Sequence, residues 1–230
     1  MSAPDVHVGT SGWAYPSWKP GFYPPGTPAS AFLAYYAERF RTVELNTTGY
    51  RLPAEDQVRR WAERTPPGFQ FAPKLNAHAR APVAAFCERM RALGDRLGPV
   101  RLLVAGARDD ALLARLEAAV DPGVRVAWDF RHPSWKGVAL PGRSVAVGDL
   151  GDDAPFRYLR LREPPYSDDD LRRWAARIRA LRGDVFVFFR HEREPTAPRL
   201  AARLAELLAA GGAHGSPPAG RRTHGSGRGG

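Results

Sequence analysis

The sequence has very little cysteine and no long hydrophobic run. Cys87 is the single cysteine among 230 residues, which excludes a framework of disulfides within the chain. No run approaches the roughly 18 apolar residues that would span a bilayer. The first residues, MSAPDVHVGTSG, lack the basic stretch and apolar block of a secretory signal. We therefore expect a cytoplasmic protein without a membrane partner, in which Cys87 fills the apolar face of a helix.

Acidic residues are fewer than basic ones. The 34 Lys and Arg residues outnumber the 24 Asp and Glu residues, which gives a formal net charge of +10 at pH 7. This excess of positive charge makes nucleic acid a possible partner, although arginines scattered over the surface would give the same net charge. Residues 211–230 are rich in Gly, Pro and Arg and predict a disordered tail. Residues 1–210 predict a single domain.

Short apolar runs alternate with amphipathic segments along most of the chain. Eight runs predict strands at residues 6–12, 42–46, 69–75, 100–105, 124–130, 144–149, 156–162 and 184–191. Helical spacing of apolar residues predicts helices at 28–40, 54–65, 82–97, 109–120, 168–181 and 196–210. This alternation predicts an α/β protein whose parallel strands close into a TIM-barrel-like (β/α)8 fold.

Two connections are too short for a full crossover helix. Little room remains between Phe130 and Ser144, and six residues separate Asp149 from Phe156, whereas a parallel crossover needs about a dozen. We expect one or two helices to be missing and the barrel to be irregular around strands 5 to 7. A doubly wound open sheet is the alternative fold, but GTSGWA after the first strand lacks the G-x-G-x-x-G spacing.

Polar and charged residues stand at the ends of several predicted strands. In residues 42–53, TVELNTTGYRLP, Glu44 and Asn46 share one strand face because side chains alternate along a strand. The carboxyl ends of barrel strands meet at one mouth. We expect the following residues to be neighbours of Glu44 and Asn46 there: Thr10, Ser11, Lys74, Asp129, Arg131, His132, Asp149, Arg160, Arg162, Arg190 and His191.

Several unusual motifs occur in an order that resembles one family. The motifs are GTSGWAYPSWKPGFYP, VELNTTGYRLP, FQFAPKL, RLGP, FRHPSWKG and YSDDDLRRWAARI. In them the sequence resembles the DUF72 (YecE-like) family over about residues 6–208. The resemblance implies a TIM-barrel-like fold and supplies no established biochemical function. The DUF72 family is similar in shape to endonuclease IV and to the xylose-isomerase-like barrels, and this similarity is only an analogy for function.

The sequence departs from the family pattern at the strand ends. Gly49 stands where the family has an aromatic residue, which predicts a wider or looser loop. Asp129 stands where many members have Glu, so the carboxylate is kept on a shorter side chain. Arg162 and Glu163 replace a His-Gly pair. These changes predict a mouth that is more basic than in the relatives.

A basic mouth that also holds carboxylates suits an anionic ligand. Guanidinium groups bind phosphate or carboxylate through paired hydrogen bonds, and a carboxylate can act as a general base. We predict an enzyme acting on a phosphorylated or carboxylated small molecule. The predicted catalytic residues are Glu44, Asp129 and Lys74, and the predicted substrate-binding residues are Asn46, Arg131, His132, Arg160, Arg190, Trp13 and Tyr50. Ion pairs that close the barrel end are the structural alternative.

Two other kinds of chemistry remain open at the mouth. His132, His191, Glu44, Asp129 and Asp149 are ligand types for Zn²⁺ or Mn²⁺. No H-E-x-x-H motif or cysteine pair singles out a metal, so we predict no cofactor while a divalent metal stays an alternative. Lys74 permits a Schiff-base mechanism if it is desolvated inside the barrel.

Nucleic-acid binding, with or without phosphodiester cleavage, is the alternative function. The first long loop holds five aromatic residues, Trp13, Tyr15, Trp18, Phe22 and Tyr23. Exposed, they would stack on bases beside a basic groove. Four prolines in the same loop favour a rigid hydrophobic lid instead.

Overall fold

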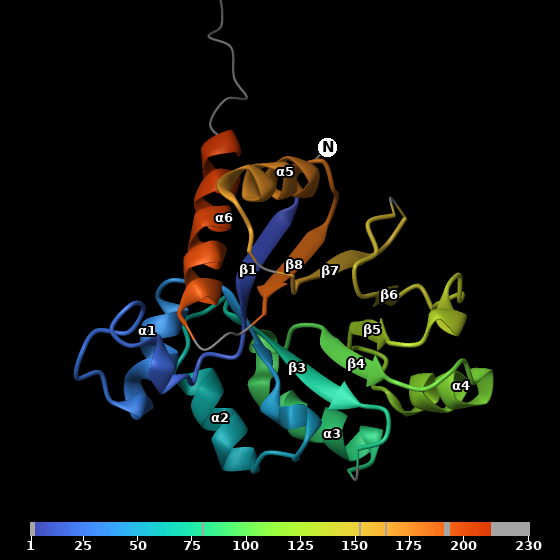
Figure 1. Cartoon of the computed structure of the whole chain (residues 1–230). Coiled ribbons are helices and arrows are strands. Elements are labelled where there is room, and N and C mark those ends of the chain that lie inside the picture. Colours follow the sequence, from blue (N-terminus) through green and yellow to red (C-terminus); the bar gives the residue numbers. More distant parts are fainter. Residues whose placement is uncertain (1–2, 80, 152, 164, 191–193, 213–230) are drawn as a thin grey trace, which may run out of the picture.

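The computed structural model describes residues 3–79, 81–151, 153–163, 165–190 and 194–212 (Figure 1). Its strands are β1 (Asp5–Ser11), β2 (Thr42–Leu45), β3 (Gln70–Asn76), β4 (Val100–Val104), β5 (Val126–Phe130), β6 (Ser144–Ala146), β7 (Phe156–Leu161) and β8 (Asp184–Phe189). All seven pairings are parallel, and the strand order is β6-β5-β4-β3-β2-β1-β8-β7. The predicted TIM-barrel-like α/β fold is confirmed.

Helices connect most of the strands. They are α1 (Phe32–Ala37), α2 (Glu55–Glu63), α3 (Val83–Met90), α4 (Asp110–Ala119), α5 (Asp168–Arg179) and α6 (Thr196–Gly212). The predicted helix at 82–97 is interrupted, because α3 continues as a 3-10 helix (Arg91–Arg96) in which Gly94 has φ of +58°. That left-handed conformation is open to glycine and breaks the regular helix. Among the described helices none is both long and apolar enough to cross a membrane.

The barrel stays partly open between β6 and β7. Within the described residues no α-helix lies on either side of β6, and the connection from β5 contains only the 3-10 turn Pro133–Trp135. The two edge strands do not pair as a ladder. The Gly148 N–H donates to the Tyr158 carbonyl at 2.9 Å and joins the two sides. The predicted irregularity around strands 5 to 7 is therefore confirmed.

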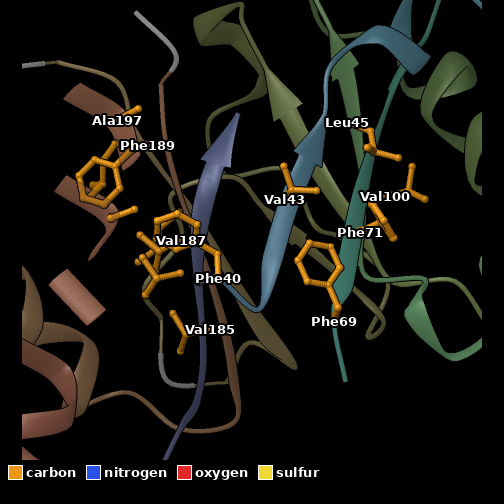
Figure 2. Close-up of a cluster of buried hydrophobic side chains, with 14 of the residues drawn as sticks. Phe40, Val43, Leu45, Phe69, Phe71, Val100, Val185, Val187, Phe189 and Ala197 are labelled. Atoms are coloured by element: carbon orange, nitrogen blue, oxygen red, sulfur yellow. The ribbon is translucent and has the colours of Figure 1, made fainter. Parts of the chain in front are cut away.

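Alternation along the strands divides the buried side chains into two sets. Outward-facing residues such as Val43, Phe71 and Val187 belong to the large core between strands and helices, part of which Figure 2 shows. Cys87 is buried in the same core, as predicted. A smaller cluster fills the barrel interior and consists of Ala72, Ala127, Val145, Phe156, Tyr158, Phe186 and Phe188. Two residues further along three of these strands, the interior side chains become charged.

Candidate functional site

Glu44 of β2 lies fully buried inside the barrel and is surrounded by hydrogen-bond donors. Its Oε1 accepts a hydrogen bond from the Tyr158 hydroxyl at 2.9 Å, and its Oε2 accepts from Ser11 Oγ at 2.9 Å and from an Arg160 nitrogen at 3.0 Å. An Arg101 nitrogen lies 2.8 Å from Oε2, and Arg160 Nε lies 2.9 Å from Oε1. Burial by itself would raise the pKa of Glu44, but Arg101 and Arg160 outweigh it and hold that pKa at about 2.

Asp129 of β5 shares the arginines of Glu44. Its Oδ2 accepts from Arg101 Nε at 2.8 Å and from Arg131 at 2.7 Å, and an Arg160 nitrogen lies 3.9 Å away. Arg101 therefore bridges the two carboxylates. We call Glu44, Asp129, Arg101, Arg131 and Arg160 the arginine–carboxylate cluster, in which three cations meet two anions.

Parallel register brings these side chains together from distant parts of the chain. Ser11 of β1 lies beside Glu44 of β2, and Lys74 of β3 lies beside Arg101 of β4. Because every strand of the barrel runs in the same direction, their interior residues near the carboxyl ends meet in one layer. This layer of charged side chains lies next to the apolar cluster of the barrel interior. The charged groups therefore have hydrophobic side chains on their inner side.

A cleft of about 460 Å³ opens beside the cluster at the end of β7. Its lining includes Arg160, Arg162, Glu163, Tyr166, Trp174 and Arg190. Burial, followed by the nearby charges of Arg131 and Arg160, lowers the pKa of Arg162. No described carboxylate lies within 4.0 Å of Arg162. Positive charge at this end of the barrel is thus only partly compensated by the side chains that the structure describes.

Lys74 and the turn after β2 form the opposite wall of the mouth. Lys74 Nζ lies 4.6 Å from the centre of the Tyr50 ring. Tyr50 is 82% exposed, whereas Gly49 is buried. A Cβ on Gly49 would come within 2.8 Å of Lys74 Cδ. The stem of Lys74 fills the space that the absent side chain leaves at Gly49. A looser loop than in the relatives stays a prediction.

Asn46 stands on the rim next to the cluster. Its side chain hydrogen-bonds with the Tyr15 hydroxyl, and that hydroxyl donates to the Ser11 carbonyl at 2.9 Å. The predicted grouping of Glu44, Asn46 and Ser11 is thus present. Arg190, also predicted, is exposed and lines the cleft at β7.

Two predicted binding residues do not join the cluster. His132 is exposed, and its Nδ1 accepts a hydrogen bond from the Ser134 N–H at 3.2 Å, so it caps the short turn Pro133–Trp135. Trp13 packs edge-on against Trp61 of α2 at 5.9 Å between ring centres. The structure places both residues away from the cluster, because strand alternation does not fix where loop residues point. Their role in substrate binding stays a prediction.

The aromatic residues of the first loop fold inward. Trp18 and Tyr23 are fully buried, and Tyr23 stacks on Phe32 of α1 at 4.0 Å between ring centres. Trp13, Tyr15 and Phe22 are partly buried against the same core. The loop forms the predicted hydrophobic lid over the helix layer, so it does not offer a row of free rings for stacking on bases.

The candidate metal ligands are dispersed. Among the described residues, no three side chains of His, Cys, Asp or Glu gather in a way that could hold a metal ion. Asp149 is exposed and accepts from the Gly151 N–H at 2.9 Å. His191 lies outside the described residues. Glu44 and Asp129 are engaged with arginines, as described above.

Arg101 and Tyr158 are central to the cluster but were not among the predicted site residues. Both belong to the interior of a strand and come before its carboxyl end. One signal was available, since Arg101 interrupts the apolar run VRLLV and faces the same side of its strand as Leu103. A charge inside such a run calls for a partner in the barrel interior.

The geometry defines what each carboxylate can do. Glu44 accepts three hydrogen bonds, lies within ion-pair distance of Arg101 and Arg160, and has a low pKa. A carboxylate with a low pKa is a weak acceptor for a proton from a substrate. The contacts of Glu44 favour a positioning role, in which it fixes the planes of Arg101 and Arg160. Asp129 does the same for Arg131, which is exposed at the mouth. The groups left facing the opening are guanidinium groups and the Lys74 amine.

Comparison with protein families gives one match that covers most of the chain. A model described as a protein of unknown function, DUF72, matches residues 7–140 and 141–222. Among curated proteins, the UPF0759 protein YecE of Escherichia coli K12 is 33% identical over 103 residues. That match covers 40% of this chain and 35% of YecE, so the aligned part spans about a third of the curated relative.

Solved structures of two similar proteins share the fold. A DUF72 family protein from Enterococcus faecalis V583 has a TM-score of 0.70 and 15% identity, with 90% of this chain and 98% of that chain covered. A DUF72 family protein from Thermotoga maritima MSB8 has a TM-score of 0.66 and 22% identity, with 89% and 99% covered. At these identities the likeness shows the architecture alone.

Proposed function

The chain belongs to the DUF72 family, and from this premise and the geometry of the mouth we propose that it is an enzyme that binds a phosphorylated or carboxylated small molecule. The observation that carries the proposal is Arg162. It is half-buried beside Arg131 and Arg160, and the described carboxylates of the cluster do not reach it. A cluster of like charges is unfavourable by itself, and an anionic ligand would relieve it.

The arrangement of the arginines suits a phosphate or carboxylate group. Arg131, Arg160 and Arg162 all stand at the opening, and Glu44 and Asp129 hold two of them in fixed orientations through contacts of 2.7 to 3.0 Å. Pre-oriented guanidinium groups bind a planar or tetrahedral anion without losing much side-chain entropy. In this proposal the two carboxylates position cations, and the general-base role predicted for Glu44 is not retained.

The cleft at the end of β7 has room for the rest of such a molecule. Its volume of about 460 Å³ lies within the range of small-molecule sites, about 300 to 1,000 Å³. Trp174 and Tyr166 supply aromatic walls beside the cationic floor. The proposed ligand therefore combines one anionic group with a small organic body.

Calorimetric titration with inorganic phosphate tests the anion site. We expect saturable binding that weakens with added salt, and Arg162→Gln should weaken it by about tenfold, equivalent to about 1.4 kcal/mol. Arg60→Gln is the matched control, because Arg60 is exposed on α2 and paired with Asp56. Equal phosphate affinity in the Arg162 variant and the unmodified chain would contradict the proposal.

Nucleic-acid binding remains a second candidate because of Tyr50. Its ring is exposed on the rim of a basic mouth, where it could stack on an unpaired base. The oligonucleotide affinity should then fall steeply as salt increases, and Tyr50→Leu should reduce it severalfold. Failure to bind a short oligonucleotide at low salt would leave the small-molecule proposal as the better account.

A further inference from the structure

Lys74 is a buried lysine whose backbone and side chain are both held in place. The Thr48 hydroxyl donates to the Lys74 carbonyl at 2.7 Å and accepts from the Lys74 N–H at 3.1 Å. The residue is 8% exposed, and its stem occupies the space beside Gly49. The amine is thus fixed at the inner edge of the mouth, under the ring of Tyr50.

No described carboxylate lies within 4.0 Å of Lys74 Nζ. This sets it apart from Arg101 and Arg160, which both contact Glu44. Its neighbour in the parallel register is Arg101, another cation. Lys74 thus presents an amine that no described carboxylate pairs. Lysine amines are the groups that form Schiff bases with carbonyl substrates.

We propose that Lys74 is a nucleophile that condenses with the carbonyl group of a phosphorylated or carboxylated aldehyde or ketone. This inference rests on the proposed anion site, which would hold the acidic group of that molecule. The amine lone pair attacks the carbonyl carbon and forms a carbon–nitrogen bond. The carbonyl oxygen then leaves as water together with the two hydrogens of the amine, and an imine remains.

Gly49 determines where the Lys74 amine lies. A methyl group at Gly49 would approach Lys74 Cδ most closely, with Lys74 Cε and Cγ at 3.0 Å. These are atoms of a flexible side chain, so Gly49→Ala would push the lysine stem aside without a backbone clash. Gly106 offers a matched control, because a Cβ there meets no atom within 4 Å.

Reductive trapping tests the imine directly. The full chain is incubated at pH 7 with glyoxylate, a carboxylated aldehyde, or with pyridoxal 5′-phosphate, a phosphorylated one, in the presence of sodium cyanoborohydride. Peptide mass spectrometry then locates the secondary amine. The chain has three lysines, Lys19, Lys74 and Lys136, so assignment is unambiguous. We expect Lys74 to be modified at least about tenfold faster than the other two, since an oriented reaction is favoured over a random encounter.

Three comparisons decide the outcome. Inorganic phosphate should slow the modification of Lys74, because it competes for the same arginines. Gly49→Ala should slow it by about tenfold or more while Gly106→Ala leaves it unchanged, since a displacement of about 1 Å can cost about a hundredfold in rate. Modification of Lys19 and Lys136 at the same rate as Lys74 would overturn the inference.

Failure of the inference and failure of the anion site are separable. Lys74→Met should abolish trapping at this position and keep phosphate binding measurable by calorimetry. If the unmodified chain binds phosphate but Lys74 is not preferentially trapped, the proposal of an imine at Lys74 is overturned and the proposal of the anion site stands. If phosphate does not bind at all, both are overturned.

Discussion

The burial of Glu44 with two arginines makes a single carboxylate important for stability. A group whose pKa is lowered on folding stabilises the fold above its pKa in the unfolded chain, and this contribution is lost as the pH falls through the folded value. For Glu44 the folded pKa is about 2 and the ordinary value 4.5. The difference corresponds to roughly 3 kcal/mol that is present above pH 4.5 and lost on acidification toward pH 2.

Glu44→Gln should therefore lower the free energy of unfolding at pH 7 by about 3 to 5 kcal/mol, because it removes the buried anion that Arg101 and Arg160 share. The deficit should shrink between pH 4.5 and pH 2. Urea unfolding across this range measures it. Glu55→Gln, which removes an exposed pair with Arg59 on α2, should cost less than about 1 kcal/mol. An unchanged unfolding midpoint in Glu44→Gln would show that the cluster is not stabilising.

His7 gives the amino-terminal end of the barrel a different pH response. It is buried and stacked on Phe186 at 4.6 Å. Burial lowers the pKa of His7, although Asp5 opposes the shift. The unfolded chain then takes up a proton near pH 6.5 that the folded chain does not bind, so stability is full above pH 6.5 and falls below it.

Replacing His7 by Phe keeps the ring stack and removes the titrating nitrogen. We expect His7→Phe to flatten the dependence of the melting temperature on pH between 7 and 5.5. Asp5, Arg41, Asp184 and Arg125 surround this end and are the same in the variant and the unmodified chain. His78→Phe, at an exposed position, should leave the pH dependence as it is. Equal slopes for His7→Phe and the unmodified chain would contradict the assignment.

At the scale of elements, α5 shows how local sequence fixes a wall of the cleft. Ser167 accepts from the Asp170 N–H, and the Asp170 carboxylate accepts from the Ser167 N–H, which makes a reciprocal cap. Trp174 of the same helix then lies on the cleft beside the arginines. The helix begins at Asp168, where the helical spacing of apolar residues predicted its start.

Ser167→Ala should lower the free energy of unfolding by about 1 kcal/mol, because one N–H at the start of α5 loses its acceptor. Guanidinium chloride unfolding measures the change. Ser17→Ala, at an exposed turn position, is the control and should have little effect. A loss well above 2 kcal/mol would indicate that Ser167 also supports contacts beyond its own helix.

The sequence predicted elements better than side-chain positions. Each apolar run became a strand because parallel strands are buried on both faces, and the short connections around β6 correctly predicted absent helices. The arginine–carboxylate cluster was predicted in part, since Glu44, Asp129 and Arg160 alternate onto the interior. Arg101 was missed because it lies deeper in its strand, and His132 was misplaced because its backbone leaves the strand direction after Phe130.

For the molecule as a whole, the incomplete closure of the barrel is the feature with the clearest consequence. The β1 and β8 strands pair over six register positions, whereas β6 and β7 share no ladder. We call the gap between β6 and β7 the seam. The cleft lined by Arg160 and Arg162 lies at this seam. The proposed ligand would therefore bind where the sheet is least constrained by backbone hydrogen bonds.

Hydrogen exchange should resolve the seam strand by strand. In a β-strand the N–H and C=O of one residue point to the same side, and successive residues alternate. The Tyr158 carbonyl accepts from Gly148 on the β6 side, while the Leu161 carbonyl accepts from Arg190 on the β8 side. The amides of Tyr158 and Arg160 consequently face the seam, and those of Leu159 and Leu161 face β8.

We expect the seam-facing amides of β7 to exchange at least about tenfold faster than those of Leu159 and Leu161, because they lack a ladder partner and the neighbouring ladder opens only with larger unfolding. Residue-resolved exchange by NMR measures all four amides within one strand. Uniform protection along β7 would mean that β6 pairs with it in solution and that the barrel is closed. The backbone amide of Arg160 faces the seam, and its guanidinium group belongs to the arginine–carboxylate cluster. Added phosphate should therefore slow the exchange of the Arg160 amide more than that of the Leu159 amide.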